Sequence, residues 1–97
     1  MRYGIRWEDQ CIQDLIAIYG DMGTADLATE GTAWALARAP LNRATWAVAP
    51  GSDYRLTWVK AYREFPAVVL SYSIVIEGIN QYCLMHRARR ANIAGGS

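Results

Sequence analysis

The stretch from Phe65 to Arg90, FPAVVLSYSIVIEGINQYCLMHRARR, constrains the fold more than any other part of this 97-residue chain. A run of strand-forming residues is followed by a turn at residues 78–80 and by a second apolar run. This order predicts a β-hairpin, because turn residues separate two segments of high strand propensity. Its last strand ends in the basic cluster His86, Arg87, Arg89 and Arg90, and functional residues are expected first at that end.

Alternation of apolar and polar residues predicts further strands upstream of the hairpin. Residues 3–7 fit a short first strand, residues 43–48 fit a strand or an irregular edge, and residues 54–63 fit a longer strand. One face of the longer strand would carry Tyr54, Leu56, Trp58, Lys60 and Tyr62. The opposite face would carry Arg55, Thr57, Val59, Ala61 and Arg63.

Between the first strand and residue 43 the apolar residues recur at helical spacing. A first helix is expected to begin at Glu8 and Asp9, because acidic groups favour the positive end of the helix dipole, and to end between Gly20 and Gly23. A second helix would be capped by Thr24 and stopped near Pro40. Gly31 lies inside it at a cost of about 1 kcal/mol relative to alanine. A close approach of the two helices is the simplest reason to carry that glycine.

One strand, two helices and then hairpin-connected strands predict an α+β fold. A helical hairpin would pack on one face of a mostly antiparallel sheet of four or five strands, and the other face would stay free for a partner. Residues 1–92 are expected to form a single domain, followed by a flexible tail at residues 93–97.

The composition restricts the function classes. Hydrophobic residues make up 53% and charged residues 20% of the chain, as in a folded globular protein. The longest apolar run is too short and too polar for a membrane span, so a cytoplasmic protein is expected. Two cysteines and one histidine offer neither a disulfide framework nor a metal site, and no cofactor is expected.

Charge is distributed unevenly along the chain. Residues 1–30 contain two arginines and six acidic residues, whereas the remainder contains eight basic and three acidic residues. An anionic partner for the second half is one explanation, and a solvated charged face is the other.

Together with this order of elements, several short segments resemble the RelE/ParE superfamily of bacterial toxins from type II toxin–antitoxin systems. The similarity extends from residue 2 to about residue 90. It is carried by Ile5-Arg6-Trp7, Asp14-Leu15, Ala37-Arg38-Ala39-Pro40, Phe65-Pro66, Leu70-Ser71-Tyr72-Ser73-Ile74 and Met85-His86-Arg87-Ala88-Arg89-Arg90.

The resemblance implies a small growth-inhibiting toxin, of the kind linked to plasmid stabilisation, that an antitoxin protein holds inactive. Some members cleave messenger RNA on the ribosome, and the ParE branch instead poisons DNA gyrase. The arginine expected near Ala67-Val68 in the ribonuclease branch is missing, and no tyrosine follows Arg90. These departures favour the ParE side, or a diverged member.

The candidate site residues follow from their chemistry. His86 is suited to general acid–base catalysis with Arg55 and Arg63, although a structural histidine is the competing interpretation. Target or antitoxin binding is assigned to Arg87, Arg89, Arg90 and Lys60, because guanidinium groups pair with carboxylates and phosphates alike. Trp34, Trp46 and Trp58 fit base stacking less well than core or interface packing.

Three functions therefore stay open. The first is a toxin that grips gyrase or a similar target and is silenced by an antitoxin. The second is an enzyme, a ribosome-dependent mRNA endoribonuclease that uses His86. The third is a non-toxic relative of the fold that binds a partner or itself. An exposed sheet face and unpaired edges favour a homodimer or an antitoxin complex in each case.

Overall fold

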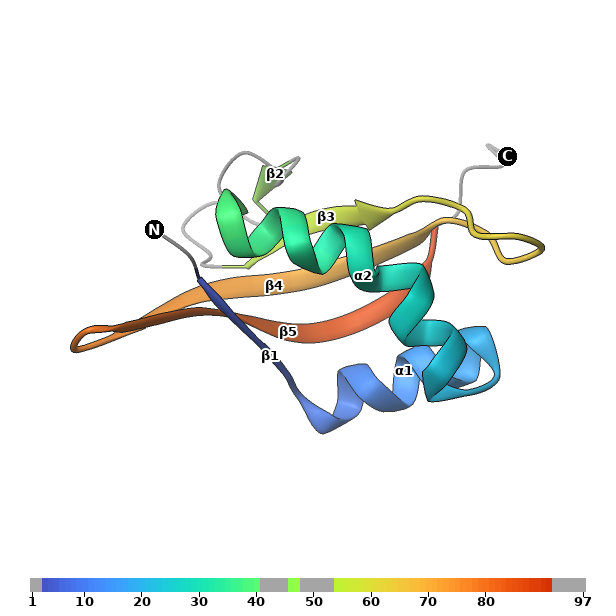
Figure 1. Ribbon diagram of the computed structural model, residues 1–97, viewed down its shortest axis with the longest axis horizontal. Helices are drawn as coiled ribbons and strands as arrows, with labels where there is room; N and C mark the ends of the chain where they lie inside the picture. Colours follow the sequence, from blue (N-terminus) through green and yellow to red (C-terminus); the bar gives the residue numbers. More distant parts are fainter. Residues whose placement is uncertain (1–2, 41–45, 48–53, 92–97) are drawn as a thin grey trace.

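The computed structural model describes residues 3–40, 46–47 and 54–91, and it confirms the predicted α+β class (Figure 1). The elements are β1 (Gly4–Trp7), α1 (Asp9–Tyr19), α2 (Met22–Arg38), β2 (Trp46–Ala47), β3 (Arg55–Val59), β4 (Val68–Glu77) and β5 (Asn80–Arg90). The sheet order is β1-β5-β4-β3-β2. β1 runs parallel to β5, and the other neighbours are antiparallel. The predicted tail at residues 93–97 and most of the predicted 43–48 strand lie outside the described residues.

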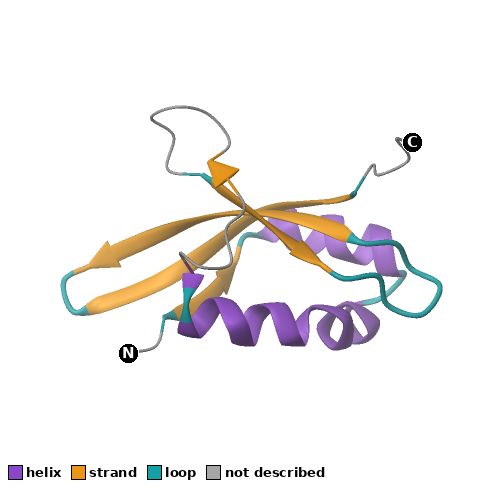
Figure 2. Cartoon of the chain, turned by 90° about the horizontal axis from the view of Figure 1, so that it is seen from above, coloured by secondary structure: helices purple, strands orange, loops and turns teal. Residues whose placement is uncertain are grey.

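Both helices pack against one side of the twisted sheet (Figure 2). α1 lies against β5, while α2 extends over β3 and β1. The core between these layers consists of Cys11, Leu15, Tyr19, Ala25, Leu36, Val59, Val68, Leu70, Tyr72, Cys83, Met85 and Ala88.

Burial raises the pKa of the Cys11 thiol to about 12 and that of the Cys83 thiol to about 11, so both cysteines act as small core residues. Neither described helix is long and apolar enough to cross a membrane.

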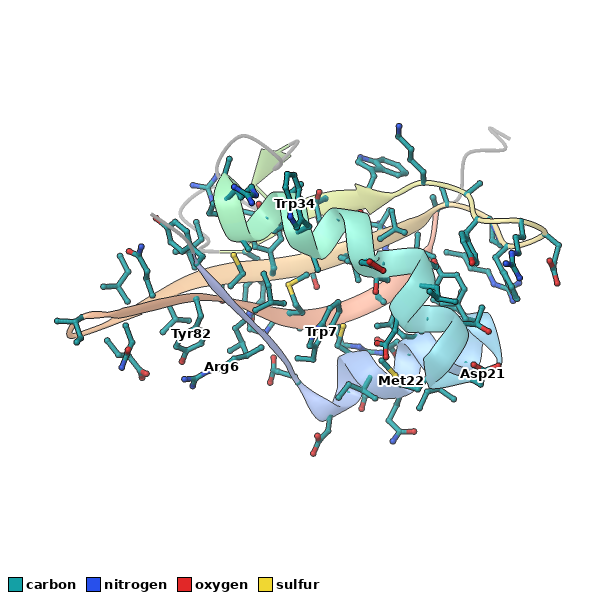
Figure 3. All side chains as sticks on the ribbon, in the orientation of Figure 1. Arg6, Trp7, Asp21, Met22, Trp34 and Tyr82 are labelled. Atoms are coloured by element: carbon teal, nitrogen blue, oxygen red, sulfur yellow. The ribbon has the colours of Figure 1, made fainter. Side chains whose placement is uncertain are left out.

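A two-residue connection joins the helices. α1 ends at Gly20, whose φ of 92° is in the left-handed region and whose N–H donates to the Ile16 carbonyl. Asp21 then caps α2 by accepting a hydrogen bond of 2.7 Å from the Thr24 N–H (Figure 3). The predicted cap at Thr24 is therefore wrong, because the carboxylate of Asp21 reaches the free amides of the first turn.

Gly31 lies on the exposed side of α2, and a Cβ placed there would meet no heavy atom within 4 Å. The expected close approach to α1 is therefore wrong.

Gly31→Ala is expected to raise the free energy of unfolding of the dilute protein by about 1 kcal/mol, because alanine favours the helix. Gly20→Ala should lower it by about 1–2 kcal/mol, because alanine strains the left-handed conformation. Chemical denaturation of both variants checks this, and equal shifts would contradict it.

The predicted 54–63 strand is shorter than expected. β3 ends at Val59, and Tyr62 and Phe65 form a separate antiparallel bridge around a turn. Arg63 within this turn has a φ of 55°. The prediction that Arg55 and Arg63 share one strand face is consequently wrong, because the strand period does not continue to Arg63.

Candidate binding face of the sheet

A β-bulge at His86 decides which side chains of β5 point away from the helices. Tyr72 pairs with Met85 and Ser71 pairs with Arg87, so His86 is the extra residue. Beyond it, Ala88 lies opposite Leu70 on the helix-covered side, and Arg89 lies opposite Val69 on the open side. Unbroken alternation would have put Arg89 beneath the helices. The bulge avoids that burial.

A hollow of about 310 Å³ lies over the C-terminal half of β5 on the open face. It is lined by Leu56, Val69, Ser71, Arg87, Ala88 and Arg89. These residues come from β3, β4 and β5, so the hollow spans the central strands. Apolar side chains beside arginines suit a partner that combines an apolar anchor with acidic groups.

Next to this hollow, His86 is held on three sides. Its Nδ1 contacts the Glu8 carboxylate, and its Nε2 lies 2.7 Å from the Ser73 Oγ. The Tyr54 ring lies 4.5 Å away, centroid to centroid, at 47° to the imidazole. In the neutral ring, Nδ1–H donates to Glu8, and the Ser73 hydroxyl donates to Nε2.

This arrangement has the polarity of an acid–base relay, because a carboxylate orients an imidazole whose second nitrogen faces a hydroxyl. Ser73 is only 8% exposed, however, and its hydroxyl occupies Nε2. An external hydroxyl would have to displace Ser73 before His86 could take its proton. The geometry therefore satisfies His86 internally and anchors the bulge.

The Asp14 carboxylate of α1 ties the helix layer to β5. It accepts hydrogen bonds of 2.7 and 3.2 Å from Arg87 and one of 3.0 Å from the Ala88 amide. The Arg87 hydrogen bonds hold the pKa of Asp14 below its usual 3.8, and the Ala88 amide acts in the same direction. The charge of Arg87 is thus paired within the protein, which leaves Arg89 as the arginine of the hollow that no described carboxylate contacts.

Asp14→Asn is expected to lower the free energy of unfolding by about 1–2 kcal/mol at neutral pH, because charge-assisted hydrogen bonds are lost. The loss is no larger because the guanidinium of Arg87 is exposed and water can solvate it. The folded-state pKa is depressed, so this stabilisation is present above the unfolded-state value of 3.8 and disappears as the pH falls below it. Urea titrations of both proteins from pH 7 to about pH 2 measure the difference. Asp26→Asn, at an exposed carboxylate of α2, is the control. A pH-independent difference would contradict the assignment.

The structure does not gather the predicted site residues into one place. Arg55 lies opposite Tyr72 on the helix-covered side, and Lys60 lines a second hollow beside α2. Arg63 stacks over Tyr62 in the β3–β4 connection, with 5.1 Å from its Cζ to the ring centroid. Arg90 pairs with Val68, again on the helix-covered side. Only Arg87 and Arg89 line the hollow, and His86 lies next to it.

Sequence reasoning missed Glu8, Ser73, Tyr54 and Asp14 as neighbours of the basic cluster. Glu8 lies 78 residues from His86, and only the parallel pairing of β1 with β5 brings them together. One local signal did exist. In Arg87-Ala88-Arg89, strict alternation after Met85 would bury two arginines, which a bulge prevents.

No three histidine, cysteine, aspartate or glutamate side chains gather as metal ligands among residues 3–40 and 54–91. No protein-family model matches the chain, and no curated protein matches it either.

Proposed function

We propose that this chain is a cytoplasmic RelE/ParE-like toxin of a type II toxin–antitoxin module. It inhibits bacterial growth by binding a protein target of the gyrase type, and an antitoxin neutralises it. The order of elements, with a helical hairpin between the first strand and an antiparallel hairpin, supports the family proposal. Because one fold serves many functions, the choice between binding and catalysis is argued from the residues of the open face and not from the fold.

Binding is favoured over RNA cleavage by a single observation, the separation of the would-be catalytic groups. RNA cleavage needs a base, an acid and cations around one phosphate. Here both ring nitrogens of His86 face protein groups, Arg55 lies on the other side of the sheet, and Arg87 is paired with Asp14. The apolar floor of the hollow is instead the kind of surface that receives a protein side chain.

A ribosome-dependent mRNA endoribonuclease is the second candidate, and it is favoured by the position of His86 next to Arg87, which lines the hollow, and by the contact of its Nε2 with a hydroxyl. Exchange of Ser73 for a substrate hydroxyl at Nε2 would convert the internal contact into general base catalysis. This candidate makes His86 essential, whereas the binding proposal does not.

Induced expression in a bacterium tests the proposal, with growth, messenger RNA integrity and plasmid supercoiling followed in one culture. We expect arrested growth, intact messages and altered supercoiling. His86→Gln is expected to keep this effect under the binding proposal and to abolish message cleavage under the second candidate. Normal growth with abundant folded protein would overturn both and leave a partner-binding protein.

A further inference from the structure

The outer face of α2 carries the most exposed indole among residues 3–40 and 54–91. Trp34 is 61% exposed and Leu27, two turns earlier, is 59% exposed. Figure 3 shows Trp34 on α2. The Arg38 guanidinium lies 4.1 Å from the Trp34 ring centroid, a cation–π contact that restricts the indole. A large side chain fixed on the surface in this way resembles an interface anchor, because little conformational entropy is left to lose.

A second hollow, of about 320 Å³, lies beside the same helix. It is lined by Ala28, Gly31, Thr32, Ala35 and Lys60. Gly31 has no neighbour that a Cβ would meet within 4 Å, so contacts within the chain do not explain a glycine that weakens the helix. A close approach from outside the chain does explain it, because only glycine leaves the floor of the hollow open.

Helix geometry places the anchor and the hollow on opposite sides of Gly31. A helix turns by about 100° per residue, so Trp34 lies about 60° to one side, and Ala28 and Ala35 lie about 60° and 40° to the other. Helical side chains lean toward the N-terminus, which brings the indole to the level of Gly31. Two copies of α2 placed side by side and parallel about a two-fold axis therefore present each Trp34 to the hollow of the other.

Charge supports the same arrangement. Glu30 is exposed and lies on the Trp34 side of Gly31, whereas Lys60 is exposed and lines the hollow. When Trp34 enters the hollow of a second copy, Glu30 comes to the edge where the Lys60 of that copy lies. Each two-fold contact then contains two opposite-charge pairs at its rim.

We propose that the chain forms a symmetric homodimer through the α2 face, with Trp34 of each copy seated in the hollow beside Gly31 of the other. The contact lies on the helix side of the sheet and leaves the open face available. It does not depend on the proposed toxicity, so either proposal can fail alone.

Sedimentation equilibrium of the purified chain, from micromolar to millimolar concentration, tests the dimer. Trp34→Ala is expected to raise the dimer dissociation constant at least about tenfold, as for a central aromatic anchor. Gly31→Leu should do the same by filling the hollow while favouring the helix, so its loss of dimer cannot come from unfolding. Ile79→Ala, at a 99% exposed residue of the β4–β5 turn, should leave the dimer unchanged.

Charge exchange gives an independent readout. Glu30→Lys and Lys60→Glu should each weaken the dimer, and the double variant should restore it. A wild-type chain that stays monomeric throughout, or a dimer that is unchanged by both Trp34→Ala and Gly31→Leu, would overturn the proposal.

Discussion

Tyr72→Ala is expected to lower the free energy of unfolding by about 3–5 kcal/mol. Tyr72 has the largest fully buried side chain described, and it projects from β4 into the layer between sheet and helices. Its hydroxyl donates to the carbonyl of buried Pro40, just beyond the C-terminus of α2. Alanine would leave a cavity and a carbonyl without its partner. The loss is a large part of the 5–15 kcal/mol typical of a domain.

Tyr72→Phe separates the two effects, because it keeps the ring and removes only the hydroxyl. We expect a loss of about 1–2 kcal/mol for this variant. Ile79→Ala, at a 99% exposed side chain, is the control and should stay within about 0.5 kcal/mol of wild type. Thermal and chemical denaturation measure all three. Equal losses for Tyr72→Phe and Tyr72→Ala would mean that the hydrogen bond, not the packing, dominates.

The fold was predictable where one face of an element is buried and the other is not. The spacing of Cys11, Leu15 and Tyr19, the buried residues of α1, leaves one consistent way to pack that helix on the core. The end of β3 at Val59 was not predictable in this way, because alternation continues in the sequence through a turn. The parallel pairing of β1 with β5 likewise joins distant segments and has no local signal.

The candidate site was predicted only in part, and the bulge explains why. The sequence indicated that His86, Arg87 and Arg89 form a cluster, but a single extra residue sends them in different directions. Arg87 turns to Asp14 of α1, Arg89 faces the hollow, and His86 fits between Glu8 and Ser73. The change in alternation that the bulge causes depends on which residues of β4 pair with β5. The residue types of β5 alone do not identify those pairs.

Arg89→Glu is expected to weaken target binding about 10- to 100-fold and to relieve growth arrest at equal expression. Arg89 lines the hollow and is exposed, so reversal of its charge opposes acidic partner groups without disturbing the core. Stability should change by no more than about 0.5 kcal/mol. Growth after induction, plasmid supercoiling and inhibition of purified gyrase by the variant measure the effect.

Arg63→Glu is the matched control, because it makes the same charge change at an exposed arginine that does not line the hollow. If Arg63→Glu relieves growth arrest as strongly as Arg89→Glu, net charge and not the hollow controls the interaction. If neither variant relieves it, the binding surface lies elsewhere. If Arg89→Glu relieves growth arrest, Arg63→Glu does not, and His86→Gln keeps it, the activity is assigned to binding at the open face. Catalysis by His86 would instead require that His86→Gln abolish growth arrest.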